Sequence, residues 1–161
     1  MSEEIITVIP EEGEEIQIAE KIAKQSKLIQ SMIDDNPDEP VPLPNVKKDI
    51  LLKAVSFIEK HIEDPLPEIE KPLKTNRLAD VVPEFYGDFV NVEVETLYQL
   101  ILAANYLDVK DLLELCCAQV AALMRGKTIE EIRELFHIEN DFTPEEEAQI
   151  KEENRWAEEA I

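Results

Sequence analysis

The positions of hydrophobic and polar residues along the chain predict two short strands at its start. IITVIP begins at residue 5, EEIQI occupies residues 14–18, and Gly13 lies in the polar stretch between them. Isoleucine and valine favour extended backbone, and a short polar connection that contains a glycine is typical of a hairpin. This pattern therefore predicts a β-hairpin.

Beyond the hairpin, apolar residues recur every three or four positions, which is the spacing of one helix face. Residues 19–34 fit one or two helices with a break near Gln25 and Ser26, and residues 46–63 fit another. The stretch between them contains four prolines, which lack the backbone N–H that a sheet ladder uses. Only a short edge strand at residues 41–43 is predicted there.

The middle of the chain is predicted to be a loop followed by helices. Residues 64–83 carry four prolines, charges of both signs and no clean period, which predicts an exposed, mobile loop. EFYGDFV then predicts a short turn or helix. Residues 94–106 and 109–125 predict two strong helices that are separated near Leu107 and Asp108.

The last part of the chain carries signals for two more helices. Gly126 is expected to end the preceding helix, because glycine readily adopts the left-handed conformation of a helix C-terminus. Thr128 and Thr143 each precede a glutamate by three residues, which is the spacing of a capping box. Pro144 occupies the first helical position, where its missing N–H costs nothing.

The helix predicted at residues 109–125 has a wide apolar surface. One strip consists of Leu113, Cys117, Val120 and Met124, and an adjacent strip consists of Val109, Leu112, Cys116 and Leu123. Together they exceed the stripe of about 100° that a surface helix needs to pack on one core. Either the chain buries this helix on several sides, or one strip faces a partner.

The acidic tail leaves the same two alternatives open for its tryptophan. Residues 128–161 contain 12 acidic and 3 basic residues, and their apolar residues form only a narrow line. Ile150, Ala157 and Ile161 share one helix side with Trp156 beside them, and such helices have little reason to hold together alone. Trp156 either caps the core of its own domain or closes over a partner, since tryptophan is a frequent interface anchor.

Composition narrows the class of partner. The chain has 161 residues, is 44% hydrophobic and carries a formal net charge of −21. That charge argues against duplex nucleic acid and against anionic membranes, since both favour Lys and Arg, and indicates a protein partner. With no basic leader, no 18-residue apolar segment and two adjacent cysteines expected to be buried and reduced, a soluble cytosolic or nuclear protein is expected.

Residues for chemistry are sparse. His61 and His137, each on a predicted helix, are the histidines of the chain, and with Cys116 and Cys117 they form no usual zinc spacing. The three glycines are isolated and form no phosphate-binding loop. An enzyme is therefore the weakest hypothesis, and neither a metal nor a cofactor is expected.

Several long segments carry a more specific pattern. They are VPLPNV at 41–46, LILAANYLDVKDLL at 100–113, GKTIEEIRELFHI at 126–138 and NDFTPEEEAQIKEENRWAEE at 140–159, together with EKIAKQS at 20–26. In this order they closely resemble the Skp family, the adaptor subunits of Skp/cullin/F-box ubiquitin ligases. The resemblance implies an α+β fold, in which a POZ/BTB-type domain, a small sheet packed with helices, extends over residues 1–125. Two helices in residues 126–161 would then complete an F-box-binding surface.

The resemblance also implies which residues meet each partner. The F-box-binding set is Tyr98, Leu113, Cys117, Val120, Ile132, Phe136, Phe142, Ile150 and Trp156. The cullin-binding set is Asn105 and Tyr106 with, less directly, Pro42 and Pro44. Pro144 matches a position that some protist members hydroxylate and then glycosylate. The loop at residues 64–83 departs from the family, because it lacks the very acidic run common in relatives.

The function implied is that of a non-catalytic adaptor. It would link F-box substrate receptors to a cullin scaffold in a multisubunit ubiquitin ligase, for ubiquitin-dependent protein degradation in the cytoplasm and nucleus. The alternative is a POZ-type self-associating structural protein, or a subunit of a non-ligase complex. The fold would also support a weak homodimer in the absence of an F-box protein.

Overall fold

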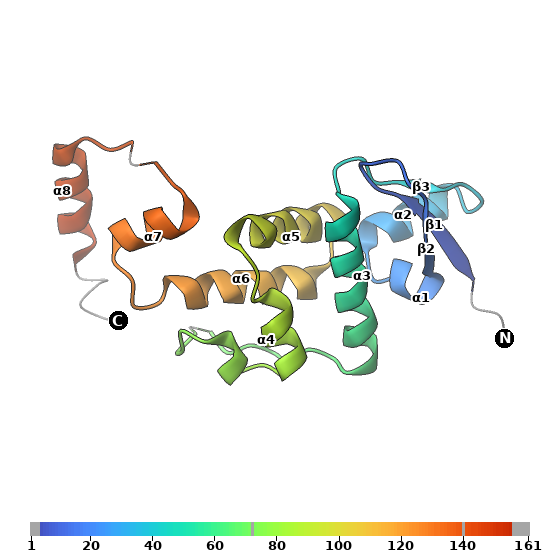
Figure 1. Ribbon diagram of the computed structural model, residues 1–161, viewed down its shortest axis with the longest axis horizontal. Helices are drawn as coiled ribbons and strands as arrows, with labels where there is room; N and C mark the ends of the chain where they lie inside the picture. Colours follow the sequence, from blue (N-terminus) through green and yellow to red (C-terminus); the bar gives the residue numbers. More distant parts are fainter. Residues whose placement is uncertain (1–3, 72, 140, 156–161) are drawn as a thin grey trace. The chain divides into compact units, whose positions relative to one another are not determined.

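The computed structural model describes residues 4–71, 73–139 and 141–155 (Figure 1). The chain divides into two compact units at Gly126, the residue at which a helix end is predicted. We call Met1–Gly126 the N-terminal unit and Lys127–Ile161 the C-terminal unit. No helix in the described part of the chain combines the length and the hydrophobicity needed to span a bilayer.

A three-stranded sheet lies at the start of the N-terminal unit. β1 (Ile5–Ile9) pairs antiparallel with β2 (Ile16–Ala19), so the predicted hairpin is confirmed, with Gly13 at a φ of 83° in its connection. β3 (Val41–Pro42) forms the predicted edge strand on the other side of β1. Its parallel pairing with β1 did not follow from the sequence pattern.

The helix break predicted near residue 25 is a side-chain cap. α1 (Glu20–Ala23) ends before Ser26, and α2 (Lys27–Asp35) begins after it. The Ser26 hydroxyl accepts the backbone N–H of Ile29 at 3.2 Å and donates to the backbone carbonyl of Leu107 at 2.5 Å. This buried serine therefore both starts α2 and joins it to a distant part of the chain.

The predicted loop at residues 64–83 is only partly correct. It follows α3 (Lys48–Glu63) and precedes α4 (Glu84–Val90), and its last part contains the 3₁₀ helix η1 (Leu78–Asp80). Leu78 and Val82 are buried, so this end of the segment belongs to the core. The sequence pattern missed this because single buried residues between prolines produce no period.

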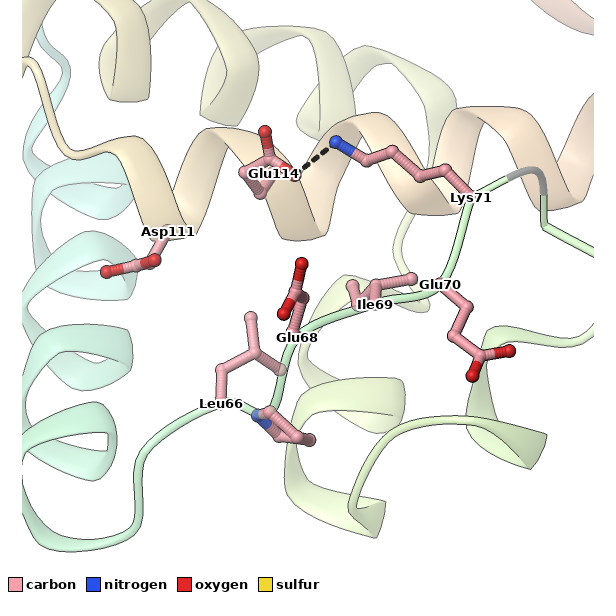
Figure 2. Close-up of a pocket in the computed structure, with 8 residues that line it drawn as sticks. Leu66, Glu68, Ile69, Glu70, Lys71, Asp111 and Glu114 are labelled. Atoms are coloured by element: carbon pink, nitrogen blue, oxygen red, sulfur yellow. Dashed lines mark hydrogen bonds and ion pairs between the residues drawn. The ribbon is translucent and has the colours of Figure 1, made fainter.

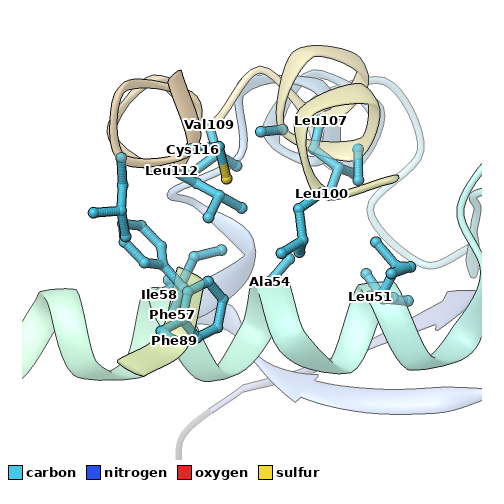
Figure 3. Close-up of a cluster of buried hydrophobic side chains, with 14 of the residues drawn as sticks. Leu51, Ala54, Phe57, Ile58, Phe89, Leu100, Leu107, Val109, Leu112 and Cys116 are labelled. Carbon is cyan, nitrogen blue, oxygen red and sulfur yellow. The ribbon is translucent and has the colours of Figure 1, made fainter. Parts of the chain in front are cut away.

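The core of the N-terminal unit lies where α3 faces two later helices. α5 (Val94–Leu107) and α6 (Lys110–Met124) meet at a tight corner, where Asp108 adopts the left-handed conformation with a φ of 54°. Figure 3 shows Phe57 and its α3 neighbours directed at Leu112 and Cys116 of α6 and at residues of α5. This packing fixes which faces of α5 and α6 stay outside the core.

The C-terminal unit contains α7 (Ile129–Phe136) and α8 (Pro144–Glu153). Both predicted threonine caps are confirmed, because Thr128 and Thr143 each accept the backbone N–H three residues later at 3.2 Å. An ion pair joins the two helices, with Arg133 Nη1 at 3.1 Å from Glu147 Oε1. His137 is not on a helix as predicted but ends α7 in the left-handed conformation.

Candidate partner-binding surfaces

The two apolar strips of α6 have different environments in the structure. In the strip that faces the core, Val109, Leu112 and Cys116 are buried. The other strip, which we call the α6 strip, consists of Leu113, Cys117, Val120 and Met124. Leu113 and Val120 are half-buried, whereas Cys117 and Met124 are exposed. The core of this chain therefore uses one strip and leaves much of the other accessible.

The two cysteines divide between these environments. Adjacent helical residues point about 100° apart, so Cys116 enters the core while Cys117 lies at the surface. The expectation that both thiols are buried is wrong for Cys117. Burial raises the pKa of the Cys116 thiol to about 12, which keeps that side chain protonated and unreactive at neutral pH.

The α5 helix carries candidates for both surfaces. Tyr98 is 37% exposed, and Leu102, one turn later, is 62% exposed. Sequence reasoning missed Leu102, although its spacing of four from Tyr98 places both on one helix side. Asn105 is exposed and Tyr106 half-buried near the end of the same helix. These four residues lie on the accessible side of α5.

The proline candidates lie on a different element. Pro42 ends β3 and Pro44 follows it, and both side chains are exposed. The α2 helix packs against both β3 and α5. The structure thus places two cullin candidates on α5 and two at the end of β3, and α2 packs against both elements. Asn105 and Tyr106 are consecutive residues near the end of α5.

The C-terminal candidates differ in accessibility. Ile132 and Ile150 are half-buried and Phe142 is 47% exposed, so each presents apolar surface. Phe136 is only 6% exposed, and a partner would reach its ring only if its surroundings moved. The prediction for Trp156 lies outside the described residues. Ile138, at 53% exposure, is an apolar residue of this unit that the predicted set omitted.

The residues considered for chemistry are the metal-ligating side chains and His61. No group of three or more metal-ligating side chains gathers within residues 4–71, 73–139 and 141–155. His61 stacks on Phe57, accepts the backbone N–H of Leu66 at Nδ1, and has Nε2 at 3.1 Å from Asp111 Oδ2. Because both ring nitrogens are engaged, the imidazole serves to hold a loop in place.

Two regions of the chain match models of one protein family. Residues 4–63 match the model for the Skp1 family, tetramerisation domain, and residues 110–157 match the model for the Skp1 family, dimerisation domain. An S-phase kinase-associated protein 1 homolog of Tetrahymena thermophila is 55% identical and is aligned over 92% of this chain and 91% of that protein. The SCF ubiquitin ligase complex protein SKP1a of Dictyostelium discoideum is 48% identical, over 88% of each chain. SKP1-like protein 1A of Arabidopsis thaliana is 41% identical, over 98% and 99%.

Proposed function

Because this chain belongs to the Skp1 family, we propose that it is the adaptor subunit of an SCF-type ubiquitin ligase and performs no chemistry itself. Its N-terminal unit has the POZ-type fold, a small sheet packed with helices. Relatives at 48% and 44% identity are named as subunits of SCF ubiquitin ligase complexes. The observation that carries the proposal is the accessible α6 strip, since a folded unit that leaves such a strip uncovered is prepared for a partner.

We propose a set of F-box-binding residues in each unit. In the N-terminal unit it comprises Tyr98 and, on α6, Leu113, Cys117 and Val120. In the C-terminal unit it comprises Ile132, Phe136, Phe142, Ile150 and Trp156. Burial by a partner removes the remaining water contact of exposed apolar side chains such as Phe142, and this loss of exposed apolar area stabilises the complex.

The proposed cullin-binding surface is Asn105 and Tyr106, with Pro42 and Pro44. The Asn105 amide is exposed and can exchange water for a hydrogen bond with a partner. Tyr106 packs partly on the core and keeps part of its side chain accessible, as aromatic anchors at interfaces do. An adaptor with two such surfaces holds the substrate receptor and the scaffold in one complex, which we place in the cytoplasm and nucleus.

Reconstitution tests this function directly. An F-box domain and the amino-terminal region of a cullin are expected to elute together from a sizing column only when this chain is present. Replacing both Asn105 and Tyr106 with alanine should weaken cullin capture about tenfold while F-box binding persists, because truncated interface anchors cost more than about 1 kcal/mol.

Matched variants separate this outcome from misfolding. Tyr106→Phe keeps the packed ring, so its thermal unfolding should match that of the unaltered chain. Loss of both partners in the Asn105 and Tyr106 double variant would indicate an unfolded protein. Cullin capture that is unchanged in the folded double variant would contradict the assigned surface.

A second function is favoured by the descriptions of the two matched models, which name dimerisation and tetramerisation. This function is that of a POZ-type self-associating structural protein or of a subunit of a non-ligase complex. The self-associating protein would use the α6 strip between copies, because the model described as a dimerisation domain covers residues 110–157. A chain that forms stable oligomers and captures no cullin would favour this alternative. Under the adaptor proposal, self-association is weak and an F-box domain displaces it.

We also propose Pro144 as a hydroxylation site. Pro144 is exposed at the first position of α8, directly after the Thr143 cap, so a modifying enzyme can reach its ring. The intact mass of the protein purified from its own cells should then exceed the sequence mass by one oxygen, or by an oxygen and attached sugars. If the peptide that contains Pro144 has the mass calculated from the sequence, the assignment is wrong.

A further inference from the structure

Residues 64–71 and 73–75, which belong to the connection between α3 and α4, lie along α6 (Figure 2). We call this segment the strap; its residue 72 lies outside the described residues. Leu66 and Glu68 point towards α6, whereas Glu70 points away from it. Leu66, Ile69 and Leu73 are half-buried and pack against the core. The segment predicted as a mobile loop is thus attached to the helix that carries the α6 strip.

Polar contacts fix the first part of the strap. The backbone N–H of Leu66 donates to Nδ1 of His61 at 3.0 Å, and the other ring nitrogen of His61 lies 3.1 Å from Asp111 of α6. The hydroxyl of the buried Tyr86 donates to the backbone carbonyl of Asp64 at 2.5 Å. The strap therefore leaves α3 in a defined direction, towards α6.

Two cations fix its later part. Lys71 Nζ lies 2.7 Å from Glu114 Oε2 of α6 (Figure 2). Arg125, directly after α6, donates from Nη1 to the backbone carbonyl of Leu73 at 3.0 Å. A cavity of about 880 Å³ remains between strap and helix, so these polar contacts, rather than continuous close packing, set their separation.

One of these contacts lies directly beside the α6 strip. On a helix with 100° per residue, Glu114 is about 60° from Cys117, so the two side chains are neighbours on the helix surface. The pKa of the Lys71 ammonium is raised, chiefly by its hydrogen bond with Glu114 and further by the negative charge of that carboxylate. The strap therefore contacts α6 at Glu114, the neighbour of Cys117 on the helix surface.

We propose that the strap forms one wall of the F-box-binding surface, and that Lys71 and Glu114 are positioning residues that hold this wall beside the α6 strip. This inference rests on the proposed function. An F-box polypeptide seated on the strip reaches the strap on the Cys117 side, because Glu114, which binds Lys71 of the strap, lies beside Cys117 on the helix surface. Lys71 and Glu114 affect the affinity for the F-box polypeptide only by holding the strap in place. Their charges must therefore be opposite, but either residue can carry the positive one.

Charge reversal of this pair provides the test. Lys71→Glu and Glu114→Lys each break the contact, whereas the double variant restores it with the charges exchanged. The affinity of one F-box domain, measured by calorimetry, should fall about threefold or more in each single variant and return to within about twofold of the unaltered chain in the double variant. Raising the salt concentration should reduce these differences.

The direction in which each single variant changes the F-box affinity distinguishes positioning of the strap from a long-range electrostatic effect of net charge. The two single variants alter the net charge in opposite directions, so a mere field would raise the affinity in one and lower it in the other. Lys74→Glu, in the same strap at an exposed position, is the matched control and should leave affinity unchanged. Thermal unfolding of all variants should coincide with that of the unaltered chain.

Two results would overturn the inference. Single variants with unaltered or oppositely changed affinity would show that the contact does not position a wall. A double variant as weak as the single variants would show the same. If the unaltered chain binds no F-box domain at all, the proposed function itself fails, and that outcome is recognised before any variant is measured.

Discussion

Cys117→Glu is expected to lower the affinity for an F-box domain at least about 30-fold. The side chain lies in the middle of the α6 strip and is exposed in the free chain, so a glutamate fits without disturbing the core. In the complex, the same carboxylate would be removed from water against apolar side chains, which costs about 2 kcal/mol or more. Calorimetric titration of the purified F-box domain measures the loss.

Two control variants show whether the loss of affinity comes from a charge placed in the α6 strip. Ser56→Glu adds the same charge at an exposed position of α3, outside both proposed binding sets, and should leave F-box affinity unchanged. Cys117→Val keeps the position apolar and should retain binding. If Cys117→Glu bound as tightly as the unaltered chain, the α6 strip would not be the F-box site. Cullin capture by Cys117→Glu should persist, because the proposed cullin-binding residues lie on α5 and at the end of β3, not on α6.

Phe57→Ala is expected to destabilise the N-terminal unit by about 3–5 kcal/mol, which is the usual cost of removing a large buried aromatic side chain. Phe57 is fully buried, and its ring meets those of Tyr86 and Phe89 at centroid distances of 5.7 and 5.8 Å. Its removal would leave a cavity where α3, α4 and α6 meet (Figure 3). Urea denaturation followed by circular dichroism measures the change.

Leu52→Ala provides the control for this stability prediction. Leu52 lies on the same helix but is 45% exposed, so its truncation should cost less than about 1 kcal/mol. Equal losses in the two variants would contradict the assigned core. Because Phe57 also stacks on His61, the strap should loosen in Phe57→Ala, and hydrogen exchange at Leu66 should become faster than in Leu52→Ala.

The elements that follow from local rules were predictable. As helix caps, Ser26, Thr128 and Thr143 act within three residues of their own positions, and a cap or a helix period needs no knowledge of distant residues. The hairpin around Gly13 was predictable for the same reason. For the candidate surfaces, the two strips of α6 were visible as a pattern, but the pattern alone could not assign one of them to the core.

Three features required contacts between distant parts of the chain. The parallel pairing of β3 with β1 joins residues more than thirty positions apart. The strap was predicted as a mobile loop because its half-buried residues follow no period, yet it contacts α6 through Lys71 and Arg125. Sequence reasoning also treated Cys116 and Cys117 alike, although only one of them enters the core.

The chain's residue order is thus sufficient for most of its helices, its hairpin, its acidic character and its membership in a family, because each depends on neighbouring residues or on long ordered motifs. The tertiary structure decides which strip of α6 remains accessible, since burial depends on where α3 and α5 pack. It also decides that the strap lies along α6, through contacts of 2.7 to 3.0 Å that no local pattern encodes.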